Sequence, residues 1–517
     1  MNFKIDNTLD ELDFNKFKLI IKFILYALCI FQIVISDFNL NAIAIVLLIC
    51  ISTNLLLHFT FNKKNFIFYF FPTFMLFSIN FVFITGPLIF QTFFFQSIVS
   101  NLSSPVSTFL IACIYQIVGI FAFSFYLKSN LSNLSKKITK KILVPMRSFQ
   151  ELKVSHVIFL LIVMILIKYY LNFIDSGINK FTEFGDVGMK ILYRISSFYY
   201  IPLVFFFKFF YVDKTVNKTS FIFVIFTYVV AGFIFALSSN GRTDFFEILF
   251  FLVALSVIIN FFIMKKKKSF SKIIILSFAL SIVVISSFIS NTILENRKIR
   301  NNVNAKELFF LSLNNLNNLK PSPTRKIIFG NMESYTGNKI IDRFVNIKLM
   351  DYTLMVSKKL SLNQRKEFND IVLNRYISIF PQPFINIFNK NFSKAKYVIS
   401  TTSIIEKVFY GDFRKGILTQ GSFLIELQII FNSFVLMYIV IFFLYLLLFI
   451  IVQSFQNNTN TEIIMSPLIL CTIMGLFRLT HDDSTIGIVY FLTRGVFEMV
   501  LFYFLITLFI KNNYNKE

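Results

Sequence analysis

The stretch SIVVISSFISNTILENRKIR, residues 281–300, contains the boundary on which the organisation of the chain depends. Its first half continues a series of apolar segments, whereas charged and amide side chains dominate from Asn291 to about residue 419. This polar connection is far longer than the usual link between packed helices. A connection of this length is typically a functional lid or a small domain.

The composition on either side of this connection predicts a membrane protein. The chain has 517 residues, of which 56% are hydrophobic and 73 are Phe, and its mean hydropathy is +0.70. No single soluble core could bury so much apolar surface. Since a helix needs about 20 apolar residues to cross the hydrocarbon, we expect about twelve spans, near 19–36, 40–60, 66–89, 105–127, 155–174, 192–211, 219–237, 245–263, 272–290, 421–452, 463–478 and 486–510.

The predicted fold class is therefore all-α, a polytopic membrane protein with one large helical loop. Residues 1–290 form the first part of the membrane domain, residues 291–419 form the loop, and residues 420–517 form the last three spans. Within the loop, apolar residues at helical spacing predict helices at 305–319, at 340–356 and around 368–376. Amphipathic helices of this kind favour a lid that lies on the membrane domain over an independent domain.

The distribution of Lys and Arg predicts the orientation in the membrane. Alternate connections are basic, for example those that contain Lys63, Lys136 and Lys265, whereas the connections at 37–39 and 91–104 have no Lys or Arg. Basic connections stay on the cytoplasmic side of a plasma membrane. Both termini are thus expected in the cytoplasm, and the long loop and the turns at 238–244 and 479–485 are expected outside.

The long loop is itself basic, with 21 Lys and Arg against 9 Asp and Glu in residues 291–419. A basic excess on the external side favours an anionic partner, although long loops are less constrained by charge than short ones. The alternative interpretation is a solvated surface in a Lys-rich protein.

The turn SSNGRTD, residues 238–244, places Arg242 at the membrane face between two apolar helices. A guanidinium in this position can bind phosphate through two parallel hydrogen bonds. The alternative is an interfacial anchor whose charged end reaches the lipid headgroups.

The long loop ends at YGDFRKG, residues 410–416, and Glu426 lies shortly inside the apolar segment that follows. A carboxylate at this depth is costly unless it is paired or reached by water. Two interpretations stay open: Glu426 is the partner of an arginine, or it is the base for a buried sugar hydroxyl.

The last outer turn is RLTHDDS, residues 478–484, which brings Arg478, His481 and Asp482 together. His481 is a candidate base or hydrogen-bond donor, or simply an interfacial polar residue. Because the outer elements contain no clear second acidic cluster, we expect no metal at Asp482. Arg494 and Glu498 follow at i, i+4 spacing, which favours a structural ion pair over a catalytic pair. With Arg194 at the same outer level, these cations suit a pyrophosphate linked to a lipid.

This combination of membrane spans, a long loop and charged outer turns resembles the repeat-unit polymerases of bacterial surface polysaccharides, the O-antigen polymerase (Wzy) family. The resemblance rests on the number of spans, on Gly241-Arg242 before a long apolar helix, on one large external loop late in the chain, and on its exit through Gly411-Asp412-Phe413 to Glu426. It implies a glycosyltransferase in the bacterial inner membrane that needs no cofactor. Its substrate would be an oligosaccharide linked to undecaprenyl pyrophosphate, with membrane lipid and a chain-length regulator protein as partners and no nucleic acid.

The resemblance also implies roles for particular residues. Arginines would stabilise the pyrophosphate as its negative charge grows, and a base would accept the proton of the attacking hydroxyl. The candidate arginines are Arg194, Arg242, Arg343, Arg478 and Arg494, and the candidate bases are Glu426, His481 and Asp482.

Other functions remain alternatives. An O-antigen ligase of similar architecture typically relies on a histidine in its large loop, and residues 291–419 contain none. A lipid-oligosaccharide flippase also has about twelve spans but has little use for a long external loop. A protein-mannosylating enzyme would need an acidic motif in the first external loop, where only Asp37 is found.

Overall fold

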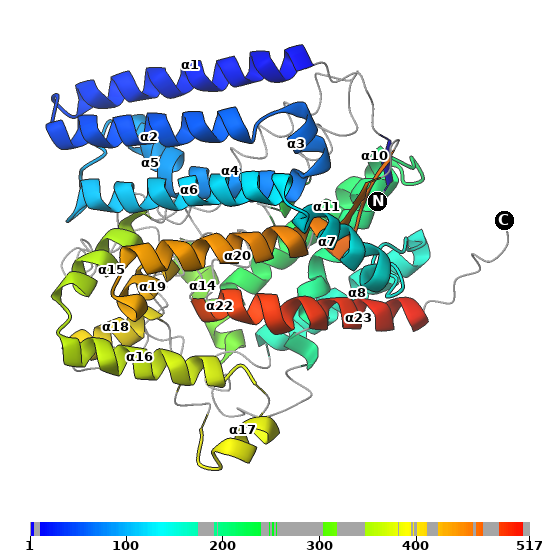
Figure 1. The fold of residues 1–517 in the computed structure, drawn as a ribbon. Coiled ribbons are helices and arrows are strands. Elements are labelled where there is room, and N and C mark those ends of the chain that lie inside the picture. Colours follow the sequence, from blue (N-terminus) through cyan, green and yellow to red (C-terminus); the bar gives the residue numbers. More distant parts are fainter. Residues whose placement is uncertain are drawn as a thin grey trace.

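The structure is a computed structural model, which describes residues 2–4, 11–173, 191–193, 195–238, 248, 251–252, 255, 303–317, 347–380, 382–393, 397, 401–410, 422–458, 462–468 and 485–509. Long helices lie side by side in it, and shorter helices gather at one end of them (Figure 1). Only a small sheet interrupts the helical architecture in these ranges. The all-α prediction is therefore confirmed.

The first half of the chain forms helices that are mostly apolar throughout. They are α1 (Glu11–Ile35), α2 (Leu40–Phe59), α3 (Lys63–Phe68), α4 (Phe70–Asn80), the π-helix η1 (Phe81–Thr85), α5 (Gly86–Phe93), α6 (Pro105–Lys128), α7 (Leu131–Ile138), the π-helix η2 (Thr139–Leu143), α8 (Val154–Phe173), the 3₁₀-helix η4 (Ser196–Tyr200), α10 (Ile201–Tyr211) and α11 (Lys218–Ser238).

The second half contains the helices of the long connection and the last membrane helices. They are α14 (Ala305–Asn317), α15 (Ile347–Lys359), α16 (Leu362–Ile377), α17 (Gln382–Phe388), α18 (Thr401–Tyr410), α19 (Phe423–Phe431), α20 (Phe434–Ser454), α22 (Thr485–Tyr490), the π-helix η8 (Phe491–Gly495) and α23 (Val496–Phe509). Helices in 305–319, 340–356 and around 368–376 were expected, and α14, α15 and α16 occupy these places.

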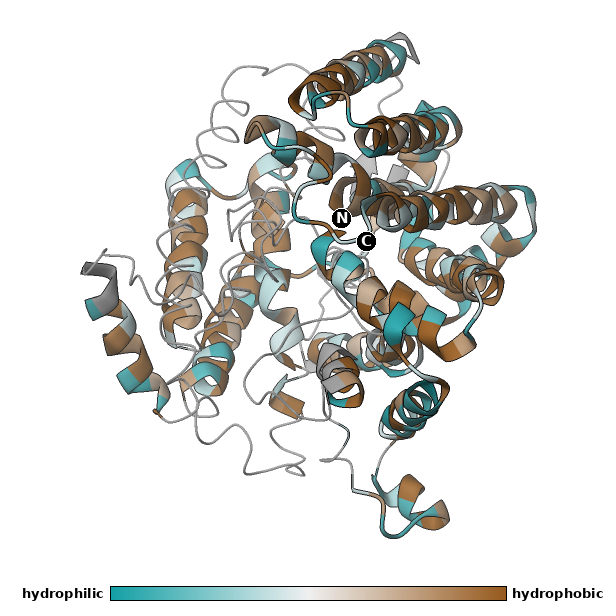
Figure 2. Cartoon of the chain, turned by 90° about the vertical axis from the view of Figure 1, so that its left-hand side faces the viewer, coloured by the Kyte–Doolittle hydropathy of each residue, from teal (hydrophilic) through white to brown (hydrophobic). Residues whose placement is uncertain are grey.

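Eight stretches in the described ranges are long and apolar enough to cross a membrane. They are Phe14–Ile35, Leu40–Phe59, Phe70–Phe93, Pro105–Lys128, Val154–Phe173, Lys218–Ser238, Phe434–Ser454 and Thr485–Leu508. Figure 2, which colours the ribbon by the hydropathy of each residue, shows long helices that are predominantly hydrophobic. These helices confirm a polytopic membrane protein, and each coincides with an expected span. The expected span at 192–211 corresponds to η4 and α10, and those at 245–263 and 272–290 lie almost wholly outside the described residues.

Two expected spans differ from the structure. The stretch at 421–452 is not one helix, because Asn432 adopts a left-handed conformation (φ 49°) that ends α19, and Ser433 caps the start of α20. Asn tolerates this conformation better than most residues. The stretch at 463–478 begins as a β-strand and not as a helix. Apolar composition alone does not reveal either change.

A three-stranded antiparallel sheet joins the N-terminus to the connection after α20. Its strands are β1 (Asn2–Lys4), β2 (Gln456–Asn458) and β3 (Glu462–Met465), in the order β1-β3-β2, with Asn2 opposite Ile464 and Gln456 opposite Met465. The sheet lies at the opposite end of the helices from α15, α16 and α18 (Figure 1). Residues 2–4 and 456–465 therefore share one end of the bundle.

The long connection is docked on the membrane helices through Asp351 of α15. This carboxylate is fully buried, and it accepts hydrogen bonds from the backbone N–H groups of Ser103 (2.7 Å) and Ser104 (2.8 Å) and from Thr108 Oγ1 (3.0 Å). Ser104 is the N-cap of α6 but its own side chain makes no capping hydrogen bond. Asp351 thus binds the turn that begins α6, at the end of the helix where the dipole favours a negative charge.

Loss of the Asp351 carboxylate should loosen α15 from α6. Asp351→Ala removes the acceptor of three hydrogen bonds from the start of α6, and leaving a donor unsatisfied costs about 1–3 kcal/mol where that donor is buried, as it is in Thr108. We expect faster amide hydrogen exchange in 347–377 of the purified protein. Asp370→Ala, which removes an exposed carboxylate of α16, serves as control and should leave the exchange unchanged. Equal exchange in Asp351→Ala and wild type would contradict this role.

The membrane helices are held together by buried polar side chains and by close backbone approach. Asn80 Nδ2 donates to Thr53 Oγ1 (3.1 Å) and to Gln116 Oε1 (3.0 Å), which joins α2, α4 and α6. Such hydrogen bonds between helices are typical inside membrane proteins. At Gly119 of α6, an added Cβ would lie 2.7 Å from Leu76 Cδ2 and 2.9 Å from Tyr445 Cζ. A side chain at position 119 would therefore force Leu76 of α4 or Tyr445 of α20 to move.

We predict that Gly119→Leu destabilises the protein, since overpacking a filled core costs about 1–3 kcal/mol. The midpoint of thermal aggregation of the detergent-solubilised protein should fall below that of wild type. Phe121→Leu, at a position of the same helix that is 66% exposed, should leave the midpoint nearly unchanged. An unaltered midpoint for Gly119→Leu would show that the two neighbours move aside without cost.

Candidate functional site

The candidate site is centred on Glu426, in the first turn of α19. The side chain is completely buried, and both of its oxygens accept hydrogen bonds from Thr485, one from the backbone N–H (3.0 Å) and one from Oγ1 (2.7 Å). A buried carboxylate is tolerated only when it is hydrogen-bonded or paired. Thr485 is the first residue of α22 and follows in the sequence directly after the stretch that contains His481 and Asp482.

Arg375 of α16 supplies a positive charge next to this carboxylate. Its Nη1 lies 3.9 Å from Glu426 Oε1, which is close enough for an ion pair but too far for a direct hydrogen bond. The Arg375 side chain is only 8% exposed. Burial lowers the pKa of Arg375, and the charge of Glu426 opposes this shift. Glu426 therefore has an arginine partner, as one of the two sequence interpretations proposed.

Tyr376 extends the network by one further hydrogen bond. Its hydroxyl donates to Thr485 Oγ1, which in turn donates to Glu426. Burial and the nearby Glu426 charge raise the pKa of Tyr376 to about 12. The phenol thus remains protonated at neutral pH and keeps its role as a donor.

The pattern of α16 explains why both residues reach the site. Phe368 and Val372 are buried, and Arg375 and Tyr376 follow Val372 by three and four residues on the same face. Ser361 and Gln364 begin this helix with a reciprocal capping box. The Gln364 side chain also donates to the Val408 carbonyl of α18 (2.9 Å), which ties α16 to its neighbour.

Arg494 forms a second charged cluster on the last membrane helix. Its Nε donates to Glu498, which also accepts from the Tyr490 hydroxyl (2.7 Å). The i, i+4 ion pair predicted from the sequence is thereby confirmed. Arg494 Nη1 in addition donates to the Ile379 carbonyl just after α16 (3.3 Å). One helical stretch, 485–509, therefore contacts the α16 region at both Thr485 and Arg494.

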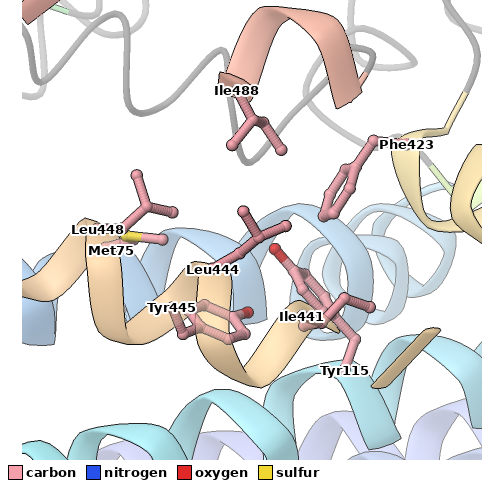
Figure 3. A pocket seen from close by; sticks show the side chains of 8 residues that line it. All are labelled: Met75, Tyr115, Phe423, Ile441, Leu444, Tyr445, Leu448 and Ile488. Carbon is pink, nitrogen blue, oxygen red and sulfur yellow. The ribbon is translucent and has the colours of Figure 1, made fainter. Parts of the chain in front are cut away.

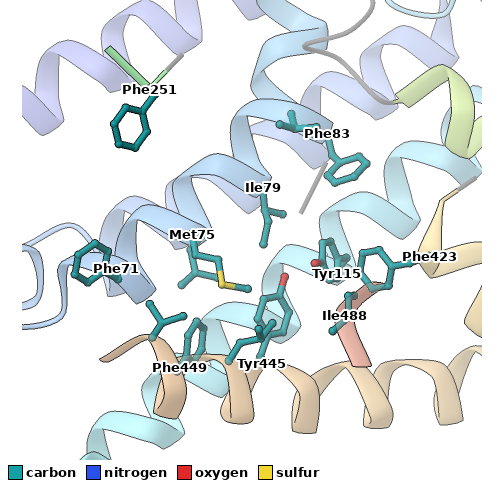
Figure 4. Close-up of a cluster of buried hydrophobic side chains, with 14 of the residues drawn as sticks. Phe71, Met75, Ile79, Phe83, Tyr115, Phe251, Phe423, Tyr445, Phe449 and Ile488 are labelled. Atoms are coloured by element: carbon teal, nitrogen blue, oxygen red, sulfur yellow. The ribbon is translucent and has the colours of Figure 1, made fainter. Parts of the chain in front are cut away.

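An apolar pocket lies beside the Glu426 network. It is lined by Met75, Tyr115, Phe423, Ile441, Leu444, Tyr445, Leu448 and Ile488 (Figure 3). Phe423 lies one helical turn before Glu426, and Ile488 lies one turn after Thr485. Figure 4 shows both side chains facing Tyr115 and Tyr445 within the buried core. The site thus combines a charged pair with an adjoining apolar surface.

The other predicted site residues fall outside the described ranges. These are Arg194, Arg242, Arg343, Arg478, His481 and Asp482. Arg375, Tyr376 and Thr485 were not predicted as site residues, although a helix was expected around 368–376. The sequence did hold one signal for Arg375: a buried Glu426 requires a positive partner, and Arg375 lies beside the apolar residues of its helix.

Comparisons with known proteins give no match: no protein-family model, no curated protein and no solved structure is significantly similar to this chain.

The buried pair should show thermodynamic coupling. Arg375→Met leaves a buried carboxylate without its cation, whereas the double variant with Glu426→Gln removes both charges. We therefore expect the double variant to lose less thermal stability than the sum of the single losses, by about 0.5–3 kcal/mol. Lys366 is exposed on α16, so the losses of stability caused by Lys366→Met and Glu426→Gln should add. Strict additivity of Arg375→Met with Glu426→Gln would show that the pair does not interact.

Proposed function

We propose that the protein is a membrane glycosyltransferase that polymerises lipid-linked oligosaccharide repeat units, as in O-antigen or capsule synthesis. The observation that supports this proposal best is the buried carboxylate of Glu426 beside Arg375, where a helix of the long connection meets the last membrane helix. A base and a cation at the boundary of the membrane suit a reaction between two lipid-linked sugars.

In the proposed reaction, a hydroxyl of one repeat unit attacks the anomeric carbon of a glycan on undecaprenyl pyrophosphate. The new glycosidic bond forms as the anomeric carbon-oxygen bond breaks, and undecaprenyl pyrophosphate leaves with the bonding electrons. The hydroxyl proton passes to Glu426, which acts as general base. Thr485 orients this carboxylate through its two hydrogen bonds.

Arg375 joins the arginines proposed from the sequence. In the proposed reaction the guanidinium, whose Nη1 is 3.9 Å from Glu426, would shift outward so that a hydroxyl lies between the two buried groups. That hydroxyl would accept from Arg375 and donate to Glu426. Arg242, Arg343, Arg478 and Arg494, with Arg194 in support, are proposed to stabilise the pyrophosphate charge without a metal or another cofactor.

The proposed location is the bacterial inner membrane, with about twelve spans, the long connection outside and both termini in the cytoplasm. The sheet that joins residues 2–4 to 456–465, at the end away from α15 and α16, is consistent with this topology. A chain-length regulator protein is proposed as a partner.

The proposal is tested by Glu426→Gln in proteoliposomes supplied with repeat units on undecaprenyl pyrophosphate. Loss of a general base should lower the polymerisation rate by about 10²–10⁴-fold. Glu367→Gln, an exposed carboxylate of α16, should polymerise like wild type. Full activity of a folded Glu426→Gln protein would exclude Glu426 as the base.

Deletion of the gene tests the function itself. Without a polymerase, the lipid core should be capped by a single repeat unit, whereas loss of a flippase or a ligase should leave no attached surface glycan. A glycan ladder of normal length after deletion would end the polymerase proposal.

A further inference from the structure

The connection between the membrane helices α6 and α8 is strongly basic. Residues 128–150 contain no Asp or Glu, and their cations are Lys128, Lys136, Lys137, Lys140, Lys141 and Arg147. All of these side chains are exposed, and we call them the basic surface. No carboxylate of the described ranges forms a salt bridge with any of them. The described part of the chain therefore supplies no counter-charge to the basic surface.

Four of the lysines lie on a helical stretch that is packed on its inner side. α7 continues directly into η2, so residues 131–143 follow one another in helical conformation. Ser135, Thr139 and Leu143 recur at intervals of four residues on this stretch, and all three are buried. The hydroxyls of Ser135 and Tyr126 of α6 share a hydrogen bond (2.8 Å), and Thr139 Oγ1 donates to the carbonyl of Ser454 (2.5 Å). The lysines thus occupy the outer side of a built element.

The same contacts place residues 131–143 at one surface of the membrane. Tyr126 lies in the last turn of α6, Ser454 is the last residue of α20, and both helices are long and apolar enough to span. α6 begins against Asp351 of α15, so its other end is the one that α7 contacts. Figure 1 shows α7 at this end of α20, away from α15 and α16. Since a 21-residue helix is about 30 Å long, like the hydrocarbon core, α7 lies at headgroup level.

Apolar side chains are exposed beside these lysines. Leu134 is 43% exposed, Ile142 is 50% exposed and Val144 is 48% exposed. Lys137 follows Leu134 by three residues, so the two side chains are neighbours on the helix surface. A soluble anion would neutralise the lysines but leave the apolar groups in water. The headgroup region accommodates both, because the lysines reach the phosphates while the apolar groups contact the acyl boundary.

We infer that the basic surface binds the phosphodiester headgroups of anionic phospholipids in the adjoining leaflet. Clusters of Lys and Arg directly after a membrane helix are typical of such binding. The lysines form two i, i+4 pairs, Lys136 with Lys140 and Lys137 with Lys141, and like charges at this spacing repel each other. A phosphate near each pair relieves this repulsion. Because Thr139 ties the stretch to the end of α20, bound lipid also holds that end in place. The inference does not depend on which reaction the protein catalyses.

The inference is tested by fluorescence, since the chain contains no Trp and an introduced tryptophan is the sole reporter. Ile142→Trp places the reporter next to the lysines. The full chain is reconstituted in nanodiscs of phosphatidylcholine with a minority of phosphatidylglycerol. Quenching is measured with bromine on the acyl chains of phosphatidylglycerol only, and then on an equal number of phosphatidylcholine molecules. Phe23→Trp, at a position of α1 that is 72% exposed, is the control reporter.

We expect brominated phosphatidylglycerol to quench the Ile142→Trp reporter several-fold more than brominated phosphatidylcholine, and both lipids to quench the Phe23→Trp reporter equally. Lys140→Gln combined with Lys141→Gln should lower the preference at least about twofold, because each basic residue adds to the attraction. Lys358→Gln combined with Lys359→Gln, an adjacent exposed pair on α15, is the matched control and should leave the preference unchanged.

Three results would overturn the inference. Equal quenching of the Ile142→Trp reporter by the two lipids, or no quenching, would exclude bound anionic lipid at this surface. A preference that survives the loss of Lys140 and Lys141 would exclude the lysines as its cause. Loss of the preference on addition of soluble glycerol phosphate would assign the surface to a free phosphate compound in place of lipid.

Discussion

The structure depends on the need to satisfy one fully buried carboxylate, that of Glu426. Its donors come from Thr485, 59 residues later in the chain, and its counter-charge comes from Arg375 in the long connection. A buried charge without such partners would cost several kcal/mol. Three distant segments must therefore meet at α19, and the break at Asn432 makes this meeting possible. If α19 and α20 formed one continuous helix, Glu426 would lie on the extended axis of α20 and not next to α16.

A second buried carboxylate, Asp351, follows the same principle. Asp351 accepts from backbone N–H groups at the start of α6, and Glu426 accepts from the backbone N–H of the first residue of α22. Both acids lie where the positive ends of helix dipoles favour negative charge. Asp351 thus ties α15 to the start of α6, and Glu426 ties α19 to the start of α22.

Sequence periodicity and hydropathy predicted the described apolar helices, because each pattern can be recognised within one helix without knowledge of its neighbours. The eight apolar stretches and the helices α14, α15 and α16 agree with the expected positions. The division of 421–452 was missed, since it depends on the backbone of a single residue, Asn432. Lys208 is another example: it lies near the end of the expected span at 192–211, and its burial between Glu151 (2.5 Å) and Asp213 (3.3 Å) depends on tertiary packing.

The candidate site was only partly predictable for the same reason. Glu426 and Arg494 stood out because charges are rare in apolar segments. The partner of Arg494 lies on its own helix at a regular spacing, so it could be found by counting residues. The partners of Glu426 are brought together only by tertiary packing, and no spacing rule connects Arg375, Thr485 and Glu426.

The contacts of the two buried acids also separate their roles. Asp351 accepts hydrogen bonds from Ser103, Ser104 and Thr108 at the start of α6, an arrangement that holds α15 against that helix. Glu426 instead lies 3.9 Å from a buried guanidinium, in a pair that is too wide for a direct hydrogen bond. A buried ion pair is weak support for stability, because apolar side chains of similar shape often serve folding better. The 3.9 Å separation of this pair is the feature on which the proposed role of Glu426 as a base rests.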